Sequence, residues 1–326
     1  MGRRFSFGIN VRFLLVYLDL INEIQVSEVI IVKRVKDQWN DLEEIIRDIG
    51  NDSFFSCPIT LQYFLNKGIS ELYISNDGLI VKNNWDFGDD YRILFQKNDS
   101  LAKELEEKNP FHLGYSFLSF SKGKSFYSEE FMFDLEELSN LEGSCFKNVR
   151  NSYNSFKKNN KGIKIYKKNG EMDTKERVKK FLEKWKREKL KRGYSTASIE
   201  RDLGILEGVK DKKHYKSILS LDGKVTGLLV SIRHPNNSDL CVNLIRKSIP
   251  SAKYAEEYLQ VEHSKRMIKK GMSFANDAPS ASKSSARFKE KFQNPNVSNK
   301  KFFHSTLYCK NKEKMTLRRM VNYPVL

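Results

Sequence analysis

The sequence has few of the residues that mark secreted or metal-binding proteins. Its 326 residues include only four cysteines and five histidines. Cys57, Cys145, Cys241 and Cys309 lie far apart, and none belongs to a CxxC pair or has histidines at metal-ligand spacing. This spacing argues against a disulfide framework and against a structural zinc site. We therefore expect a reducing compartment, with the cytoplasm as the location, and no metal.

Long apolar runs are also lacking. The most apolar stretch near the start, VRFLLVYLDLI, is far shorter than the roughly 20 residues that a membrane-spanning helix needs, and Asp19 interrupts it. No small-residue cleavage site follows, as a secretory signal would require. We expect a buried helix or strand here, and a protein without a transmembrane segment.

Acidic residues are scarce in one region. Between Lys147 and Arg192 there are eighteen Lys or Arg and five Asp or Glu, so this region carries +13 of the formal net charge of +17. A concentration of positive charge of this kind is typical of a surface that binds a polyanion. The charge therefore points to a phosphate-rich partner.

The length and an apolar content of 39% predict two packed units. We expect a divergent N-terminal unit at 1–125, a C-terminal unit at 171–326, and a joining segment at 126–170 made of a basic helix and a strand. Periodicity in the first unit predicts helices at 35–49 and 101–108, a hairpin at 72–81, and strands at 91–96 and 115–121.

The second unit has a clear order of elements. A helix at 174–191 with Thr174 as its N-cap is followed by a polar loop and by a hairpin whose turn is Asp222-Gly223. A strand at 239–247, a helix at 254–270, a strand that ends at FAND, a basic helix at 282–292 and a strand at 302–309 that closes the sheet complete the order. This order is expected of the acyltransferase fold on a central mixed sheet, commonly called the GNAT fold. The predicted fold class is mixed α/β, with tandem GNAT-like units.

Two segments resemble a known family. FMFDLEELSNLEGSCFKNVRNSYNSFKK resembles the catalytic domain of lysylphosphatidylglycerol synthases and their soluble relatives, in which an acidic, apolar lead-in and a Gly precede a basic helix with an Arg-Asn pair, here Arg150-Asn151. Its tail, continued by NNKGIKIYK, is also similar to the Fem-type peptidoglycan aminoacyltransferases. FANDAPSASKSSARFKEKFQNP looks like the closing motif of the family, although residues 278–281 replace the usual acidic residue and glycines. The resemblance covers roughly residues 110–310.

The resemblance implies that an aminoacyl group is moved from aminoacyl-tRNA to an amine or hydroxyl acceptor. Because the donor is already an activated ester, the protein has only to position the acceptor, remove a proton and stabilise the oxyanion. No cofactor beyond the donor substrate is expected. The acceptor, a lipid headgroup, a peptide or a small molecule, stays open, and the expected protein is a soluble member without the membrane-embedded half.

Candidate site residues fall into three groups. Asn276 and Asp277 end a strand where such sheets open, and they are the catalytic candidates together with Lys289, which matches the lysine of the family motif. Tyr254 and Glu257 begin the long helix and are candidates for an acceptor cleft. Contacts to donor phosphates are expected from the basic helices, at Lys147, Arg150, Asn151, Lys157 and Arg287.

Two other functions compete with this interpretation. An acetyl-CoA-dependent N-acyltransferase would need a glycine-containing loop that cradles the pyrophosphate, yet RKSIPSAKYAEEYL contains no glycine, and Pro250 removes a donor. A non-catalytic RNA-binding protein would be consistent with the basic region and its interleaved Tyr153, Phe156 and Tyr166. The charge is also compatible with contact to a membrane surface, but no basic amphipathic helix with exposed aromatic residues is evident.

Overall fold

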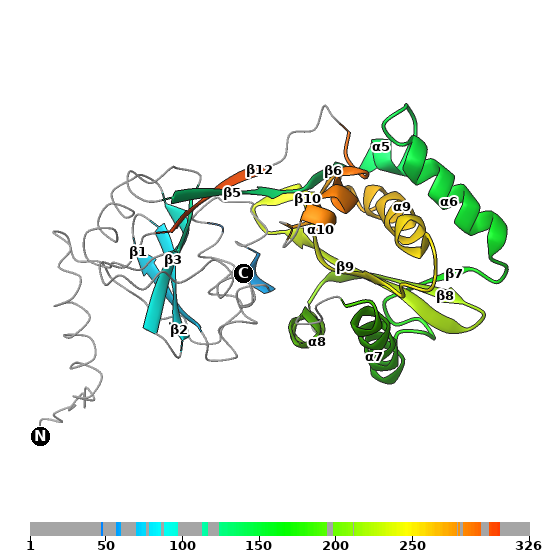
Figure 1. Cartoon of the computed structure of the whole chain (residues 1–326), viewed down its shortest axis with the longest axis horizontal. Coiled ribbons are helices and arrows are strands. Elements are labelled where there is room, and N and C mark those ends of the chain that lie inside the picture. Colours follow the sequence, from blue (N-terminus) through cyan, green and yellow to red (C-terminus); the bar gives the residue numbers. More distant parts are fainter. Residues whose placement is uncertain are drawn as a thin grey trace, which may run out of the picture.

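The computed structural model describes residues 47, 57–59, 70–75, 78–85, 88–96, 113–116, 124–193, 198–210, 212–278, 280, 283–294 and 300–306. These residues form three sheets with helices packed on the largest of them (Figure 1). In this described part of the chain, no helix is both long and apolar enough to cross a membrane.

The N-terminal sheet is a three-stranded antiparallel meander. It contains β1 (Ser70–Ser75), β2 (Gly78–Trp85) and β3 (Gly88–Gln96) in that order. The predicted hairpin at 72–81 and the strand at 91–96 are therefore confirmed. The helices predicted at 35–49 and 101–108 lie outside the described residues, apart from Arg47, which is helical.

A second three-stranded sheet joins distant parts of the sequence. Its order is β4 (Leu113–Ser116), β12 (Lys300–Thr306) and β5 (Lys124–Glu130), and both pairings are antiparallel. The prediction that the last strand closes the sheet of the second unit is wrong. The short strand β6 (Met132–Asp134) already pairs with the outer edge of that sheet, so β12 pairs with β4 and β5 instead.

The large sheet has six strands and mixed direction. Its order is β6, β11 (Phe274–Asn276), β10 (Asn237–Ser248), β9 (Lys224–His234), β8 (His214–Leu221) and β7 (Lys164–Lys167). β10 and β11 run parallel, whereas the other neighbouring strands run antiparallel. The predicted fold class, mixed α/β with a GNAT-like order of elements, is confirmed. The domain boundaries, including a second, divergent copy at 1–125, stay a prediction.

Alternating side chains of the central strands build a core on each face of this sheet. Leu228, Val230 and Ile232 of β9 pack on one face, which α7 (Lys175–Lys191) and α8 (Ser198–Gly208) cover, whereas Leu229 packs on the other. The opposite face carries α5 (Leu135–Asn140), α6 (Lys147–Asn159) and α9 (Ala255–Ile268), with α10 (Lys283–Glu290) nearby (Figure 1). The period of two in β9 is therefore the pattern of a strand covered on both sides.

Local sequence signals account for the start of α7 and for the turn between β8 and β9. Thr174 accepts a hydrogen bond from the amide of Arg177 at 3.2 Å, as predicted for an N-cap. Asp222 and Gly223 have φ values of 47° and 75°, which are the left-handed conformations of a tight hairpin turn. The polar loop predicted after α7 is wrong in part, because α8 forms there. α8 has only a weak apolar stripe, and burial of Ile205 on the sheet stabilises it.

The hairpin turn offers a stability test. Substitution Gly223→Ala places a side chain at a φ of 75°, and the left-handed conformation should lower the free energy of unfolding by about 1–2 kcal/mol. Gly208 ends α8, and a Cβ there would meet nothing within 4 Å. Gly208→Ala should therefore leave stability unchanged or raise it by up to about 1 kcal/mol. Urea denaturation of the two variants checks this, and equal effects would contradict the turn assignment.

Candidate active site

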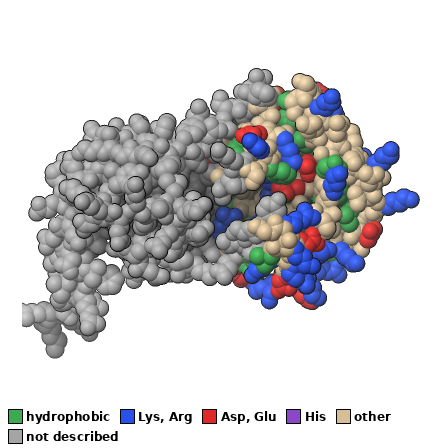
Figure 2. Space-filling model, viewed as in Figure 1, with side chains coloured by type: hydrophobic (Ala, Val, Ile, Leu, Met, Phe, Trp, Pro, Cys, Tyr) green, Lys and Arg blue, Asp and Glu red, His purple; other side chains and the backbone are tan. Residues whose placement is uncertain are grey.

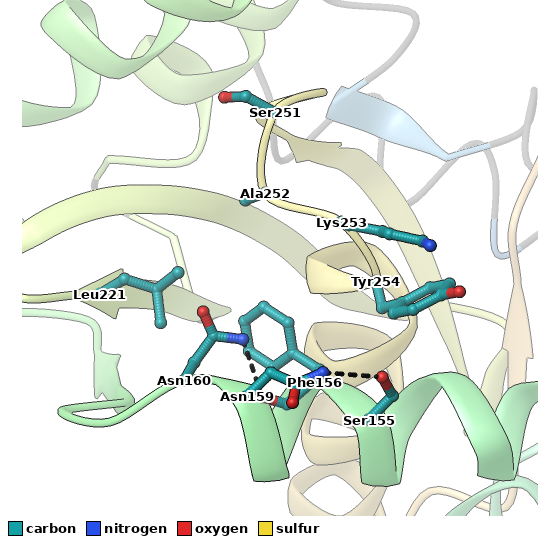
Figure 3. Close-up of a pocket in the computed structure, with 9 residues that line it drawn as sticks. All are labelled: Ser155, Phe156, Asn159, Asn160, Leu221, Ser251, Ala252, Lys253 and Tyr254. Atoms are coloured by element: carbon teal, nitrogen blue, oxygen red, sulfur yellow. Dashed lines mark hydrogen bonds between the residues drawn. The ribbon is translucent and has the colours of Figure 1, made fainter.

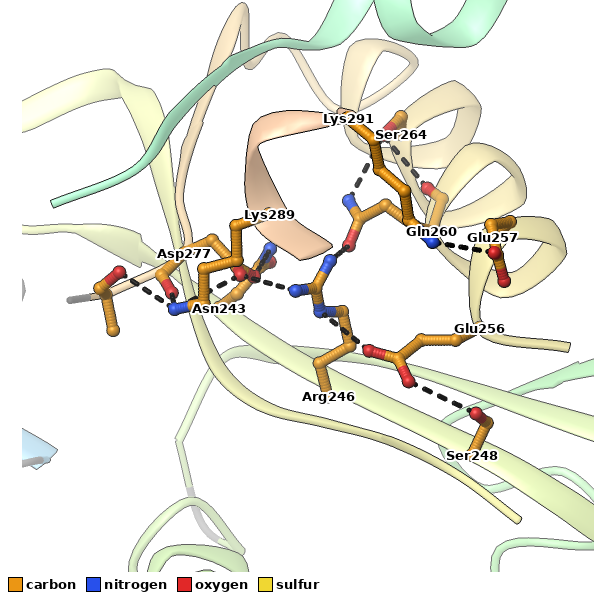
Figure 4. Close-up of polar contacts among 11 residues, drawn as sticks. Asn243, Arg246, Ser248, Glu256, Glu257, Gln260, Ser264, Asp277, Lys289 and Lys291 are labelled. Carbon is orange, nitrogen blue, oxygen red and sulfur yellow. Dashed lines mark hydrogen bonds and ion pairs between the residues drawn. The ribbon is translucent and has the colours of Figure 1, made fainter. Parts of the chain in front are cut away.

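The site begins where β10 and β11 part. β11 pairs with β10 only from Leu240↔Phe274 to Val242↔Asn276, and β10 then continues to Ser248 without it. Polar side chains fill the opening beyond the last pair, as Figure 4 shows. They come from β10, from the residue after β11, from the first turn of α9 and from α10. This is the position at which the sequence predicts that the sheet opens.

A buried ion pair joins the two strands. Arg246 Nη2 lies 2.8 Å from Asp277 Oδ2, and the side chains are 8% and 3% exposed. Asn243 Nδ2 donates a hydrogen bond to the other carboxylate oxygen at 2.9 Å. The Arg246 guanidinium also lies 5.0–5.8 Å from the centroids of three aromatic rings, those of Phe133, Phe288 and Phe292. Both charges are thus paired in an apolar setting, where removing one partner is costly.

Lys289 brings a second cation to the same carboxylate. Its Nζ lies 3.5 Å from Asp277 Oδ2 and donates hydrogen bonds to the carbonyl oxygens of Asp277 and, at 2.9 Å, Ala278. Burial lowers the pKa of Lys289 to about 8, although the charge of Asp277 opposes this shift. An amine with this pKa exchanges a proton readily near neutral pH, which is the property of a general acid or base.

The first turn of α9 completes the network. Glu256 Oε1 lies 3.5 Å from Arg246 Nε, and its other oxygen accepts a hydrogen bond from Ser248 Oγ at 3.3 Å. Burial raises the pKa of Glu256, whereas the charge of Arg246 opposes the shift. One residue further, Glu257 is paired with Lys291 of the segment after α10 at 2.7 Å. We call the set Asn243, Arg246, Glu256, Asp277 and Lys289 the polar network.

The structure brings together two of the three predicted catalytic residues. Asp277 and Lys289 are in direct contact. Asn276 is fully buried beside them. Its side-chain nitrogen donates to the Glu130 carboxylate at Oε2, and its side-chain oxygen accepts from the backbone amide of Ala278 at 3.0 Å. Asn276 therefore holds the turn that carries Asp277. A direct role of Asn276 in chemistry stays a prediction.

The predicted acceptor-cleft residues, Tyr254 and Glu257, have different surroundings at the start of α9. Glu257 follows Glu256 of the polar network in the sequence and pairs with Lys291. Tyr254, which precedes α9 with a φ of 66°, lines a separate pocket between the end of α6 and the β10–α9 connection (Figure 3). Binding of an acceptor at these residues stays a prediction.

The predicted phosphate contacts are mostly exposed. Lys147, Asn151 and Lys157 lie on the surface of α6, and Arg287 is exposed on α10. Arg150 is partly buried, because its guanidinium donates to the carbonyl oxygens of Leu141 and, at 3.1 Å, Gly143. It therefore fixes the turn that precedes α6. Figure 2 shows Lys and Arg side chains over much of the described face, with a dense group at its lower edge, where Figure 1 places α7 and α8.

Three members of the polar network, Asn243, Arg246 and Glu256, were not among the residues predicted for the site. The strand sequence LCVNLIRK does contain a signal, since an Asn and an Arg are unusual within an otherwise apolar, buried strand. Burial of such groups needs polar partners, and those partners come from α9 and from the residue after β11. Sequence spacing alone does not reveal these partners.

Comparison with known proteins assigns the chain to a family. Residues 124–292, more than half of the chain, match the family model described as phosphatidylglycerol lysyltransferase, C-terminal. The chain belongs to this family. The matched segment runs from β5 to the end of the α10 region, so it includes all of the polar network. The predicted resemblance to lysylphosphatidylglycerol synthases is thereby confirmed, and the protein is a member of an acyltransferase family.

Solved structures with the same fold extend beyond the matched segment. A conserved protein of unknown function from Bacteroides thetaiotaomicron is 14% identical, with a TM-score of 0.63 over 85% of this chain and 100% of that chain. The L-PGS structure from Bacillus licheniformis is 15% identical, with a TM-score of 0.58 over 89% and 97% of the two chains. FemX is 9% identical, with a TM-score of 0.54 over 84% and 97%. These likenesses show the fold. No curated protein sequence matches the chain.

The low pKa of Lys289 predicts a pH dependence of stability in this family member. Between about 8 and the ordinary value of 10.5, the unfolded chain binds more protons at this site than the folded chain. Burial of the charged Lys289 ammonium therefore lowers the free energy of unfolding by its full amount below pH 8. This destabilisation disappears as the pH rises to 10.5. Relative to Lys289→Met, the wild type should gain stability across this range.

Urea denaturation at several pH values measures this difference. Lys269→Met, at an exposed lysine beyond the far end of α9, controls for the loss of one positive charge. A stability difference between wild type and Lys289→Met that stays constant with pH would show that Lys289 is not desolvated.

Proposed function

We propose that the protein transfers an aminoacyl group from aminoacyl-tRNA to an amine or hydroxyl acceptor, and that the polar network carries the chemistry. The observation that carries this proposal is the contact between Asp277 and the desolvated amine of Lys289, at the sheet opening of a phosphatidylglycerol lysyltransferase family member. Titratable residues with strongly shifted pKa values are concentrated at functional sites.

The reaction needs one proton to move. The acceptor nitrogen or oxygen attacks the carbonyl carbon of the aminoacyl ester, loses its proton, and the ester bond to the tRNA ribose breaks. Neutral Lys289 would accept the proton from the acceptor and would return it to the ribose oxygen that leaves. Asp277 would orient Lys289, and Arg246 would stabilise the negative charge on the carbonyl oxygen.

The donor would be held through its phosphates. The segment 147–168 contains eight Lys or Arg and no Asp or Glu, and it forms α6 and the edge strand β7. In the described part of the chain, Lys147 and Lys157 have no ion pair, so neither charge is neutralised by the protein. Because each phosphate contact releases counterions, binding should depend steeply on salt. Asn151 and Arg287 are further contacts in this proposal, whereas Arg150 would act through the turn it holds.

The structure offers little support for acetyl-CoA as the donor. In the β10–α9 connection, the amide of Ser251 already donates to Glu188 Oε2 at 2.9 Å, and its hydroxyl donates to the other oxygen. Pro250 has no amide hydrogen, so two successive residues offer no backbone donor for a pyrophosphate. No cofactor is therefore part of the proposal. The acceptor is left as a lipid headgroup, a peptide or a small molecule.

Catalysis is tested by following labelled amino acid lost from charged total tRNA, with and without cell extract as the source of acceptor. Asp277→Asn and Lys289→Met should slow the extract-dependent loss by a factor of about 100 or more, as expected when proton transfer is disabled. Lys269→Ala should react as the wild type does. Full activity in Lys289→Met, with folding confirmed by circular dichroism, would overturn the assigned role.

Donor binding is tested by measuring the affinity for tRNA at several salt concentrations. The double variant Lys147→Ala/Lys157→Ala should weaken binding and reduce the slope of log K against log salt by about 2, because each phosphate contact contributes about 1. Lys269→Ala should keep the wild-type slope. An unchanged slope in the double variant would remove α6 from the donor surface.

A further inference from the structure

The turn that follows β11 has a backbone conformation that is unusual for its residue. Ala278 has a φ of 61°, in the left-handed region that residues with a Cβ rarely adopt. A strained conformation of this kind persists only where the surrounding structure holds it. The contacts that hold Ala278 therefore indicate which residues set the geometry of the neighbouring Asp277.

Hydrogen bonds hold this turn from two sides. The amide of Ala278 donates to Asn276 Oδ1 at 3.0 Å, and Lys289 Nζ donates to the carbonyl oxygen of Ala278 at 2.9 Å. From the other side, the amide of Phe131 donates to the same carbonyl oxygen at 3.4 Å, and the carbonyl oxygen of Phe131 accepts from the amide of Asp277 at 2.8 Å. The turn is therefore fixed between α10 and the residue that joins β5 to β6.

Glu130 secures this arrangement from the second sheet. It is the last residue of β5, it is fully buried, and its Oε2 accepts a hydrogen bond from Asn276 Nδ2. Backbone pairing of β5 with β12 places Glu130 opposite Lys300. A carboxylate only accepts hydrogen bonds, so the Asn276 amide cannot turn over without placing its oxygen against Glu130. The Asn276 oxygen is thereby kept directed at the amide of Ala278.

We propose that Glu130 is a positioning residue for the proton transfer. It fixes the orientation of the Asn276 amide, which holds the Ala278 turn and, with it, the carbonyl oxygens of Asp277 and Ala278 that bind the Lys289 ammonium. The inference rests on the proposed function, because it concerns the proton transfer assigned to Lys289. The second sheet thus supports, through the end of β5, the reaction centre of the large sheet.

A loss of this support should appear in the titration of Lys289. Burial is the main cause of its low pKa, the charge of Asp277 opposes the shift, and the charges of Arg246 on β10 and Arg201 on α8 add to it. α9 contributes Glu256, which pairs with Arg246. Because all four of these groups remain in a variant at position 130, a changed pKa of Lys289 reports a changed geometry or the charge of residue 130 itself.

Two substitutions separate the reach of the Glu130 side chain from its charge. Glu130→Asp keeps the carboxylate but shortens the side chain by one methylene, so the contact with Asn276 should be lost. Water admitted by the loosened turn should then raise the pKa of Lys289 by about one unit and slow transfer at pH 7 about tenfold. Glu130→Gln keeps the length and an acceptor oxygen and should titrate as the wild type does. So should Glu183→Asp, the same change at an exposed position of α7.

The titration is measured by NMR on protein whose lysines carry ¹³C at Cε, and the signal missing from Lys289→Met assigns Lys289. The pH dependence of transfer is followed in the same variants. Glycine adopts a positive φ without strain, so Ala278→Gly should make the turn less dependent on Glu130. Adding Glu130→Asp to Ala278→Gly should therefore shift the Lys289 titration less than adding it to the wild type.

Equal titrations of Lys289 in wild type and Glu130→Asp, with folding confirmed by circular dichroism, would overturn the proposal. A raised pKa in Glu130→Gln would also overturn it, because the charge and not the reach would then be responsible; this result is decisive even if Glu130→Asp does not fold. An equal shift with and without Ala278→Gly would show that the effect does not pass through the turn. The NMR titration needs no transfer, so a wild type without transfer refutes only the aminoacyltransferase.

Discussion

The ion pair between Arg246 and Asp277 is the interaction on which the architecture of the site depends. β10 and β11 share only three paired residues before they part, so backbone hydrogen bonds cannot hold the opening. The side-chain contact replaces them and joins β10 to the turn after β11. Lys289 and Glu256 then attach α10 and α9 to the same two charges. Buried charges without such partners would be strongly unfavourable, so the network also restricts how the helices can pack.

Charge is divided between the inside and the outside of the protein. Inside, cations and carboxylates alternate in the polar network, and a second buried pair, Lys247 with Asp202 at 2.7 Å, joins β10 to α8. Outside, α6 carries cations without any acidic residue. Desolvation shifts the pKa values of Lys289, Glu256 and Lys247 inside the protein, whereas salt screens the external charges. A single chain thus combines a buried network of paired charges with an exposed basic helix.

Turns and helix caps that depend on a few neighbouring residues are predicted correctly from the sequence. The Asp222-Gly223 turn and the Thr174 cap each follow from a few adjacent residues, and both are confirmed. Long-range pairing is not predicted by such patterns: the sequence pattern places β12 in the large sheet and a loop at α8, and the structure shows otherwise. β12 pairs with a strand more than 170 residues earlier in the chain, and the stability of α8 comes from burial on the sheet. Neither is encoded in a short window.

The sequence by itself determined the family, the mixed α/β class, the basic character of α6, and Asp277 and Lys289 as site candidates. These follow from motifs and composition, which do not require knowledge of contacts. Only the tertiary structure decided that Arg246 and Glu256 belong with Asp277, that Arg150 fixes a turn, and that Tyr254 lines a pocket whose lining includes no member of the polar network. The physical reason is burial, since the partners and the pKa of a buried group are set by residues that folding brings from distant parts of the chain.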